Sequence, residues 1–120
     1  MSKPINIILI ADNELTRQMG LMHRKPLKKT ECAFFNFPRE GKHSFWNKNV
    51  DFPISLIFCD SEQKVQDVKF LEAQQLNSVT SDSFDIKYVI EAHKEAPSLF
   101  DIKKGAKAVI ENNSIIFKEE

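Results

Sequence analysis

CAFFNF at residues 32–37, ISLIFCD at residues 54–60 and VQDVKFL at residues 65–71 decide the fold. Each stretch is short and rich in β-branched or aromatic residues, which favours a β-strand. The first is followed by PREG at residues 38–41, and the last two are separated by DSEQK at residues 60–64. Both connections contain turn-forming residues. The centre of the chain therefore predicts a β-sheet with tight connections.

Further strands between and on both sides of these three stretches make the chain mainly β. They are expected at residues 5–11, 43–48, 86–92, 106–111 and 114–118. Asn112 and Asn113 suit a two-residue turn between the last two strands, because asparagine tolerates positive φ. Residues 72–85 are predicted to be a surface loop and residues 96–100 a short helix. A chain this short hides its sheet edges most economically by curling, so we expect a compact, single-domain β-barrel-like fold over residues 1–120, with one or two short helices.

The first helix is predicted to begin after Asp12, which can cap it. Pro26 disfavours helical geometry in the residue before it, so the helix should end near His23 or Arg24. Gly20 indicates either a close backbone contact or an earlier end, since glycine destabilises a helix interior. Three apolar residues fall on one stripe of this helix: Leu15, Met19 and Met22.

The charge balance argues against a dedicated nucleic-acid binder. The chain has 17 Lys and Arg residues and 17 Asp and Glu residues, so its formal net charge is zero, whereas binding to a phosphate backbone needs a basic surplus. No stretch approaches the ~20 apolar residues of a membrane span, and the apolar run at residues 5–11 is shorter than a typical secretory segment. We therefore expect a cytoplasmic protein that binds neither nucleic acid nor membrane. Its oligomeric state is left open.

No metal, cofactor or catalytic nucleophile is predicted. Cys32 and Cys59 lie in apolar runs, which favours two buried, reduced thiols over a disulfide or a nucleophilic cysteine. The three histidines lack the spacing of a zinc site. Glycine-rich phosphate loops and the G-x-S-x-G nucleophile motif do not occur.

Three stretches carry a family resemblance: ELTRQMGLMHRKPL (14–27), FWNKNVDFPISLIFCD (45–60) and YVIEAHKEAPSLFDIKKG (88–105). In order and spacing they resemble the family catalogued as domain of unknown function 192, small bacterial and archaeal proteins of which many are secreted or periplasmic. The matching residues are Arg17, Gly20, Leu21, Met22, Arg24, Leu27, Phe45, Trp46, Lys48, Asn49, Pro53, Glu91 and Gly105. The family pattern has Met, Thr and Asp where this chain has Asn47, Val50 and Ser55. The resemblance implies a compact β-barrel-like domain and brings no established activity.

The cations of these motifs predict a ligand site. Arg17 and Arg24 are seven residues apart, so on a helix they share a face and could grip a carboxylate or phosphate. Lys48 and Asn49 could add a charge and a directed amide, and Trp46 could supply an apolar wall. The sequence thus predicts an electropositive cleft between the first helix and residues 45–53. Glu91, in a strand, is expected to have a cationic partner.

Three functions remain open from the sequence. The favoured one is a non-catalytic module that binds a small anionic or polar ligand through Arg17, Arg24, Trp46, Lys48, Asn49 and Glu91. The first alternative is a hydrolytic enzyme with Glu91 or Asp51 as acid or base. The second is a structural or interaction protein, in which Arg17 pairs with Glu14 and Lys48 pairs with Glu91.

Overall fold

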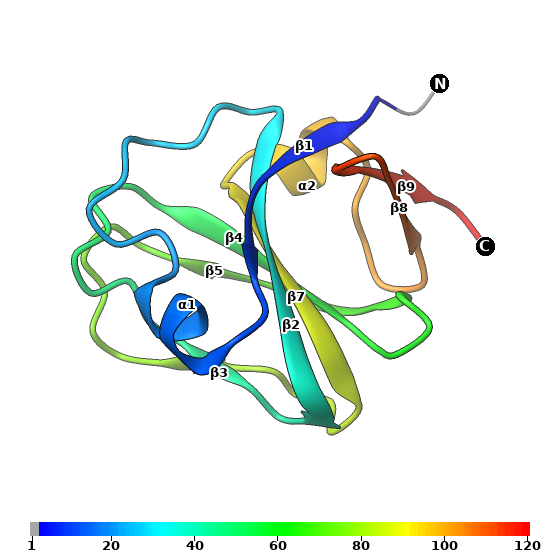
Figure 1. Ribbon diagram of the computed structural model, residues 1–120. Coiled ribbons are helices and arrows are strands. Elements are labelled where there is room, and N and C mark those ends of the chain that lie inside the picture. The colour runs from blue at the N-terminus through cyan, green and yellow to red at the C-terminus, as the bar shows by residue number, and fades with distance from the viewer. Residues whose placement is uncertain (1–2) are drawn as a thin grey trace.

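The computed structural model describes residues 3–120, which form nine strands and two short helices (Figure 1). In chain order these are β1 (Ile5–Ala11), α1 (Glu14–Met19), β2 (Glu31–Gly41), β3 (Ser44–Phe45), β4 (Ile54–Cys59), β5 (Val65–Leu71), β6 (Val79–Thr80), β7 (Ile86–His93), α2 (Ala96–Leu99), β8 (Lys107–Glu111) and β9 (Ser114–Lys118). The predicted mainly β class with short helices is confirmed.

The large sheet is strongly curled. Within residues 3–120, seven strands form it in the order β5-β4-β7-β2-β1-β9-β8, while β3 pairs with β6 separately. β1 and β2 run parallel, and the other neighbours run antiparallel. The two end strands meet where the Val65 N–H donates to the Ala106 carbonyl at 2.8 Å and the Gly105 N–H donates to the Val65 carbonyl at 2.9 Å. This contact is one isolated bridge, Lys64↔Lys107, and not a continuous strand pair, so the sheet is a curled half-barrel. The barrel-like prediction is confirmed in this form.

Two hydrophobic cores lie on opposite faces of this sheet. Cys32 and Phe34 of β2 point into the core that α2, β8 and β9 cover. Ala33 and Phe35 point into the second core, because successive side chains of a strand alternate between faces. β4 is buried at every position, which explains why its sequence is almost continuously apolar. In Figure 1, α1 and β3 lie together on one side of the sheet, away from the β8–β9 hairpin.

The predicted boundaries of β2 and β3 were wrong. Residues 38–41 continue β2 instead of forming a turn, and β3 covers only Ser44–Phe45 of the predicted 43–48. Proline lacks a backbone N–H, yet Pro38 is tolerated because the pairing of β2 with β7 shifts register between Asn36 and Gly41. β3 ends early because the chain turns away, with the Asn47 N–H donating to the Gln75 carbonyl at 2.7 Å.

The last hairpin follows its prediction closely. β8 and β9 pair from Lys107↔Lys118 to Glu111↔Ser114. Asn112 and Asn113 join them with φ values of 51° and 61°. Two consecutive positive φ angles are the geometry of the tight hairpin turn that matches strand twist.

Helix α1 differs from its prediction at both ends. Its N-cap is Asn13 in place of Asp12, and the Asn13 side chain accepts a hydrogen bond from the Thr16 N–H at 2.9 Å. It ends at Met19, well before His23 or Arg24, because Gly20 takes a φ of 45°. Of the apolar stripe, only Met22 packs against a core, since Leu15 is 69% exposed and Met19 is 48% exposed. The earlier end that Gly20 indicated is confirmed.

Replacing Gly20 with alanine is expected to destabilise the protein by ~1–3 kcal/mol, the usual cost of a side chain in a backbone region that favours glycine. An added Cβ would also lie 3.4 Å from Cζ of Phe35. Gly41→Ala is the matched control, because Gly41 has no positive φ and the nearest atom to an added Cβ is 4.0 Å away. Urea denaturation measures both variants. Equal stability of the two would contradict the role given to Gly20.

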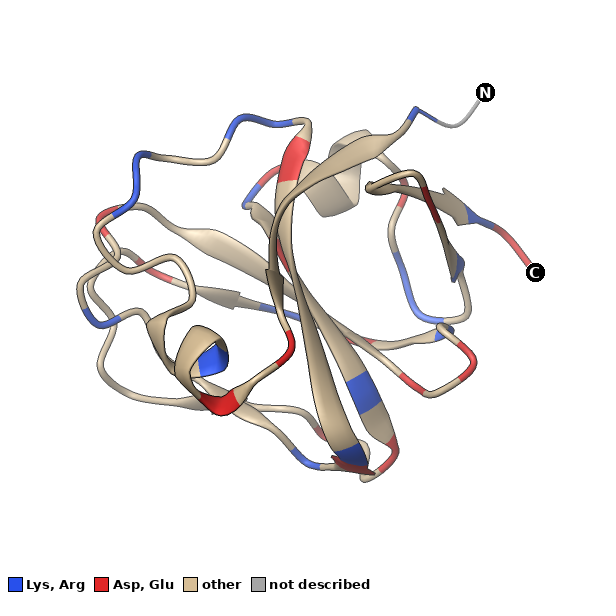
Figure 2. Ribbon diagram, viewed as in Figure 1, with Lys and Arg blue, Asp and Glu red and all other residues tan. Residues whose placement is uncertain are grey.

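Charged residues are distributed over the whole described chain. Figure 2 shows blue and red segments interspersed on the strands, on α1 and in the loops. Among residues 3–120, no helix is both long enough and apolar enough to cross a membrane.

Candidate functional site

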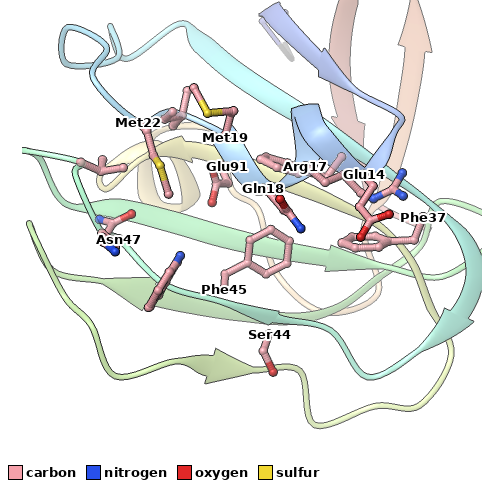
Figure 3. A pocket seen from close by; sticks show the side chains of 16 residues that line it. Glu14, Arg17, Gln18, Met19, Met22, Phe37, Ser44, Phe45, Asn47 and Glu91 are labelled. Carbon is pink, nitrogen blue, oxygen red and sulfur yellow. The ribbon is translucent and has the colours of Figure 1, made fainter.

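A pocket of about 320 Å³ opens between the α1 region, residues 14–22, and the β3 region, residues 44–50 (Figure 3). The sequence predicted a cleft in this place. Its apolar lining consists of Met19, Leu21, Met22, Phe35, Phe37, Phe45, Trp46 and Val50, beside Gly20. Its polar lining consists of Glu14, Arg17, Gln18, Ser44, Asn47, Lys48 and Glu91. A mainly apolar hollow with a few polar groups is the usual composition of a small-molecule site.

Aromatic rings fix the shape of this pocket. The ring of Phe45 packs edge-on against Phe35, with the centroids 5.2 Å apart, and against Phe37, with the centroids 6.0 Å apart. Edge-to-face pairs at such distances are favourable arrangements. Trp46, beside them, is 45% exposed and forms part of the outer wall. The pocket is therefore walled by aromatic rings that pack on one another and is open on one side.

Arg17 and Lys48 supply the positive charge of the pocket, and each lies over an aromatic ring. Cζ of Arg17 is 5.4 Å from the ring centre of Phe37, and Nζ of Lys48 is 5.5 Å from that of Trp46. Arg17 also donates from Nη1 to the Asn36 carbonyl at 2.9 Å. Neither of the predicted pairs, Arg17 with Glu14 and Lys48 with Glu91, is among the ion pairs of residues 3–120.

Glu91 is the buried carboxyl of this pocket. It lies in β7 between Ala33 of β2 and Leu56 of β4, and it is 4% exposed. Within the described chain its carboxyl has neither an ion-pair partner nor a hydrogen-bond partner. The prediction that Glu91 has a cationic partner was therefore wrong. Burial raises the pKa of Glu91 to about 8. Glu91 is therefore mainly a neutral carboxylic acid at pH 7.

Asn47 is a functional candidate that the sequence analysis did not include. It is 1% exposed, and its Nδ2 donates to the carbonyls of Phe52 at 3.1 Å and Glu72 at 2.9 Å. These bonds hold the segment after β3 in place. Its Oδ1 is buried and has no hydrogen-bond partner in the structure of residues 3–120. The signal in the sequence was an amide between Trp46 and Lys48, at a position where the family pattern has methionine.

Two predicted site residues lie outside the pocket. Arg24 follows the end of α1 and is exposed, so it shares no helix face with Arg17. Asn49 sits in a turn with a φ of 60°, where its N–H donates to Gln74 Oε1 at 3.2 Å and its carbonyl accepts from the His23 N–H at 2.9 Å. The structure therefore groups only Arg17, Trp46, Lys48 and Glu91 of the six predicted residues.

The other reactive groups of the chain serve the fold. Cys32 and Cys59 are free and buried, and burial raises the pKa of Cys32 to about 12. Asp51 accepts a hydrogen bond from Gln74 and does not line the pocket. The Ser55 hydroxyl donates to the His93 carbonyl at 3.0 Å, so it braces β4 against β7. Between residues 3 and 120, no cluster of three or more His, Cys, Asp or Glu residues could hold a metal ion.

Two solved structures are similar to this chain in fold. One, from Sinorhizobium meliloti 1021, is named a "putative transcription regulator"; it is 15% identical, with a TM-score of 0.77, over 96% of this chain and 89% of the other. The second is a protein of unknown function from Novosphingobium aromaticivorans DSM 12444; it is 16% identical, with a TM-score of 0.76, over 96% of this chain and 84% of the other. At such identities the similarity shows the fold alone.

Sequence comparison gives the family. No curated protein matches the chain significantly. Residues 3–110 match the family DUF192, described as "Uncharacterized ACR". This match covers most of the chain and includes all three stretches that carried the resemblance. The chain belongs to the family of domain of unknown function 192.

Proposed function

We propose that this protein is a non-catalytic module that binds a small ligand in the pocket between α1 and residues 44–50. One observation carries the proposal: the pocket is lined by two buried polar side chains, Asn47, whose Oδ1 has no hydrogen-bond partner within residues 3–120, and Glu91, whose carboxyl enters none of the ion pairs of those residues. Buried polar groups in proteins are almost always hydrogen-bonded. A ligand in the pocket would supply the missing partners.

The residues that line the pocket indicate which kind of ligand would fit it. Its body is apolar or aromatic and small enough for about 320 Å³, since Phe45, Trp46 and Met22 form much of the wall. It carries a polar group that meets Glu91 and Asn47. A negatively charged substituent is favoured near Arg17 and Lys48, in keeping with the small anionic or polar ligand that the sequence predicted.

Replacing Trp46 with alanine is expected to weaken ligand binding about tenfold, because it removes an aromatic wall. Ligands are found by screening small aromatic amides, alcohols, acids and amines by two-dimensional NMR and thermal shift, since binding stabilises the folded state in proportion to RT ln(1 + [L]/Kd). Phe70→Ala is the matched control, because Phe70 is also an exposed aromatic residue but does not line the pocket. If no compound perturbs the resonances of the pocket residues, the proposal is wrong.

A hydrolytic enzyme is the second candidate, and one feature favours it. The neutral carboxyl of Glu91 in a pocket could act as a general acid near pH 7. Hydrolysis of esters, amides and glycosides that is abolished in Glu91→Gln would support this function over simple binding.

Two further predictions from the sequence stay open. If Arg17 only braces the fold through the Asn36 carbonyl, Arg17→Ala lowers the melting temperature without changing ligand affinity.

The cytoplasmic location also stays a prediction, which cell fractionation would test.

A further inference from the structure

We propose, as a step that rests on the proposed function, that the part of the pocket lined by Asn47 and Glu91 recognises an uncharged carboxamide group that both donates and accepts hydrogen bonds. The ligand amide N–H would donate to Asn47 Oδ1, and its carbonyl oxygen would accept from the protonated carboxyl of Glu91. Aromatic or aliphatic primary amides are the class of ligand that fits this pairing.

The unused hydrogen-bonding capacity of Asn47 shows which kind of ligand atom can meet it. A side-chain amide has two donors and one oxygen acceptor. Both donors of Asn47 are used by the carbonyls of Phe52 and Glu72, which also fixes which atom of the amide is the oxygen. The buried Oδ1 can therefore only accept. The ligand atom that meets it must be a donor.

The protonation state of Glu91 shows which kind of ligand atom can meet its carboxyl. The side chains directly beside it on the neighbouring strands are Ala33 and Leu56, which offer it neither charge nor hydrogen bond. Burial holds its pKa near 8, so a proton remains on the carboxyl at pH 7. A protonated carboxyl is a strong donor. The ligand atom that meets this proton must be an acceptor.

The charged groups around the pocket argue against a cationic head group at this position. Arg17 and Lys48 line the pocket with one opposing carboxylate, Glu14, and the neutral Glu91 adds no negative charge. An ammonium ligand would enter a region of net positive charge and would need Glu91 to ionise. An anionic head group would leave Asn47 Oδ1 without a donor. In Figure 3, Glu91 lies near the centre of the group and Asn47 at its left edge, with Met22 between them.

A matched set of probes tests this inference. Benzamide, benzoate, benzylamine and toluene share one ring and differ in the head group. NMR titration at pH 7 is expected to show benzamide binding about tenfold more tightly than each of the other three, the usual effect of pairing buried polar groups. Tighter binding of benzylamine or benzoate overturns the carboxamide assignment but leaves the proposed function standing. Absence of binding by all four probes overturns both.

Substitutions at Glu91 separate recognition from packing. Glu91→Gln keeps one donor and one acceptor without an ionisable proton, so benzamide should bind it within a few-fold of the wild type. Glu91→Leu should lose about tenfold in benzamide affinity while toluene affinity is kept. If Glu91→Leu binds benzamide as tightly as the wild type, Glu91 does not contact the head group and the inference is wrong.

The pH profile gives a further readout. Benzamide does not ionise near neutral pH, so any pH dependence comes from the protein. Wild-type affinity should fall as the pH rises through about 8, because Glu91 loses the proton that it donates, whereas Glu91→Gln should show no such fall. His43, which stacks on Phe37, does not interfere, because burial lowers its pKa from 6.5. Equal pH profiles for the two proteins would overturn the role of the Glu91 proton.

Discussion

The free energy of unfolding is expected to fall by a few kcal/mol as the pH rises from about 4.5 to about 8, and Glu91 is the cause. In the unfolded chain Glu91 ionises near its ordinary pKa of 4.5, whereas burial in the folded protein raises that pKa to about 8. Between these values the folded state binds more protons than the unfolded state, so stability declines with pH. Each unit of pKa difference is worth about 1.4 kcal/mol, and the decline ends above the folded pKa.

Glu91→Gln isolates this effect, because glutamine keeps the shape of the side chain and cannot ionise. Relative to the wild type, the variant should gain a few kcal/mol of stability between pH 5 and about 8 in urea titrations. The comparison is needed because His43 makes stability rise with pH below pH 6.5. This opposite slope arises because burial lowers the pKa of His43 in the folded state. Glu14→Gln, a change at an exposed residue of the same pocket, is the control and should follow the wild type. Parallel curves for the wild type and Glu91→Gln would refute the buried, unpaired carboxyl.

An unpaired carboxyl in a core is a cost that apolar packing would avoid. Neighbouring positions on the same face, such as Ala33, Leu56 and Val89, are apolar and buried. Positions where a chain departs from the local packing rule at a cost to stability are commonly functional sites. The stability effect of Glu91 and its proposed role in the pocket are therefore two consequences of the same burial.

Local sequence signals predicted most of the sheet. Strand β5 and the Asn112–Asn113 hairpin follow from short-range patterns, because enrichment in β-branched residues and turn chemistry are properties of adjacent residues. The end of α1 was harder, since Pro26 and Gly20 gave competing signals and Gly20 acts six residues earlier. That error had a consequence for the site, because it removed Arg24 from the helix face of Arg17.

The pairing of site residues could not be predicted, because it depends on the order of the strands. β7 lies between β4 and β2, which places Glu91 among apolar neighbours and gives it no cation. A sequence shows that a glutamate lies in a strand but not which strands flank it. The role of Asn47 was hidden for a similar reason, since its partners Phe52 and Glu72 are set by the path of two loops.

Phe35→Ala is expected to destabilise the protein by about 3–5 kcal/mol, the usual range for removing a fully buried phenylalanine. Phe35 is 1% exposed, packs edge-on against Phe45 and lies directly beneath Gly20. Its ring separates the second core from the pocket, because it belongs to both. The cavity left by the substitution would therefore join the pocket, and probe binding should weaken together with stability.

Phe58→Ala separates these two effects. Phe58 is 0% exposed and also contacts the ring of Phe45, but it does not line the pocket. Its loss should cost a similar ~3–5 kcal/mol, while the folded fraction keeps its affinity for small aromatic probes. Phe35→Leu, a smaller change, keeps the measurement possible if the alanine variant is largely unfolded. If both alanine variants lose stability equally and both bind probes as the wild type does, the pocket wall does not depend on Phe35. Weakened binding in Phe35→Ala alone would tie the shape of the pocket to the core residue beneath α1.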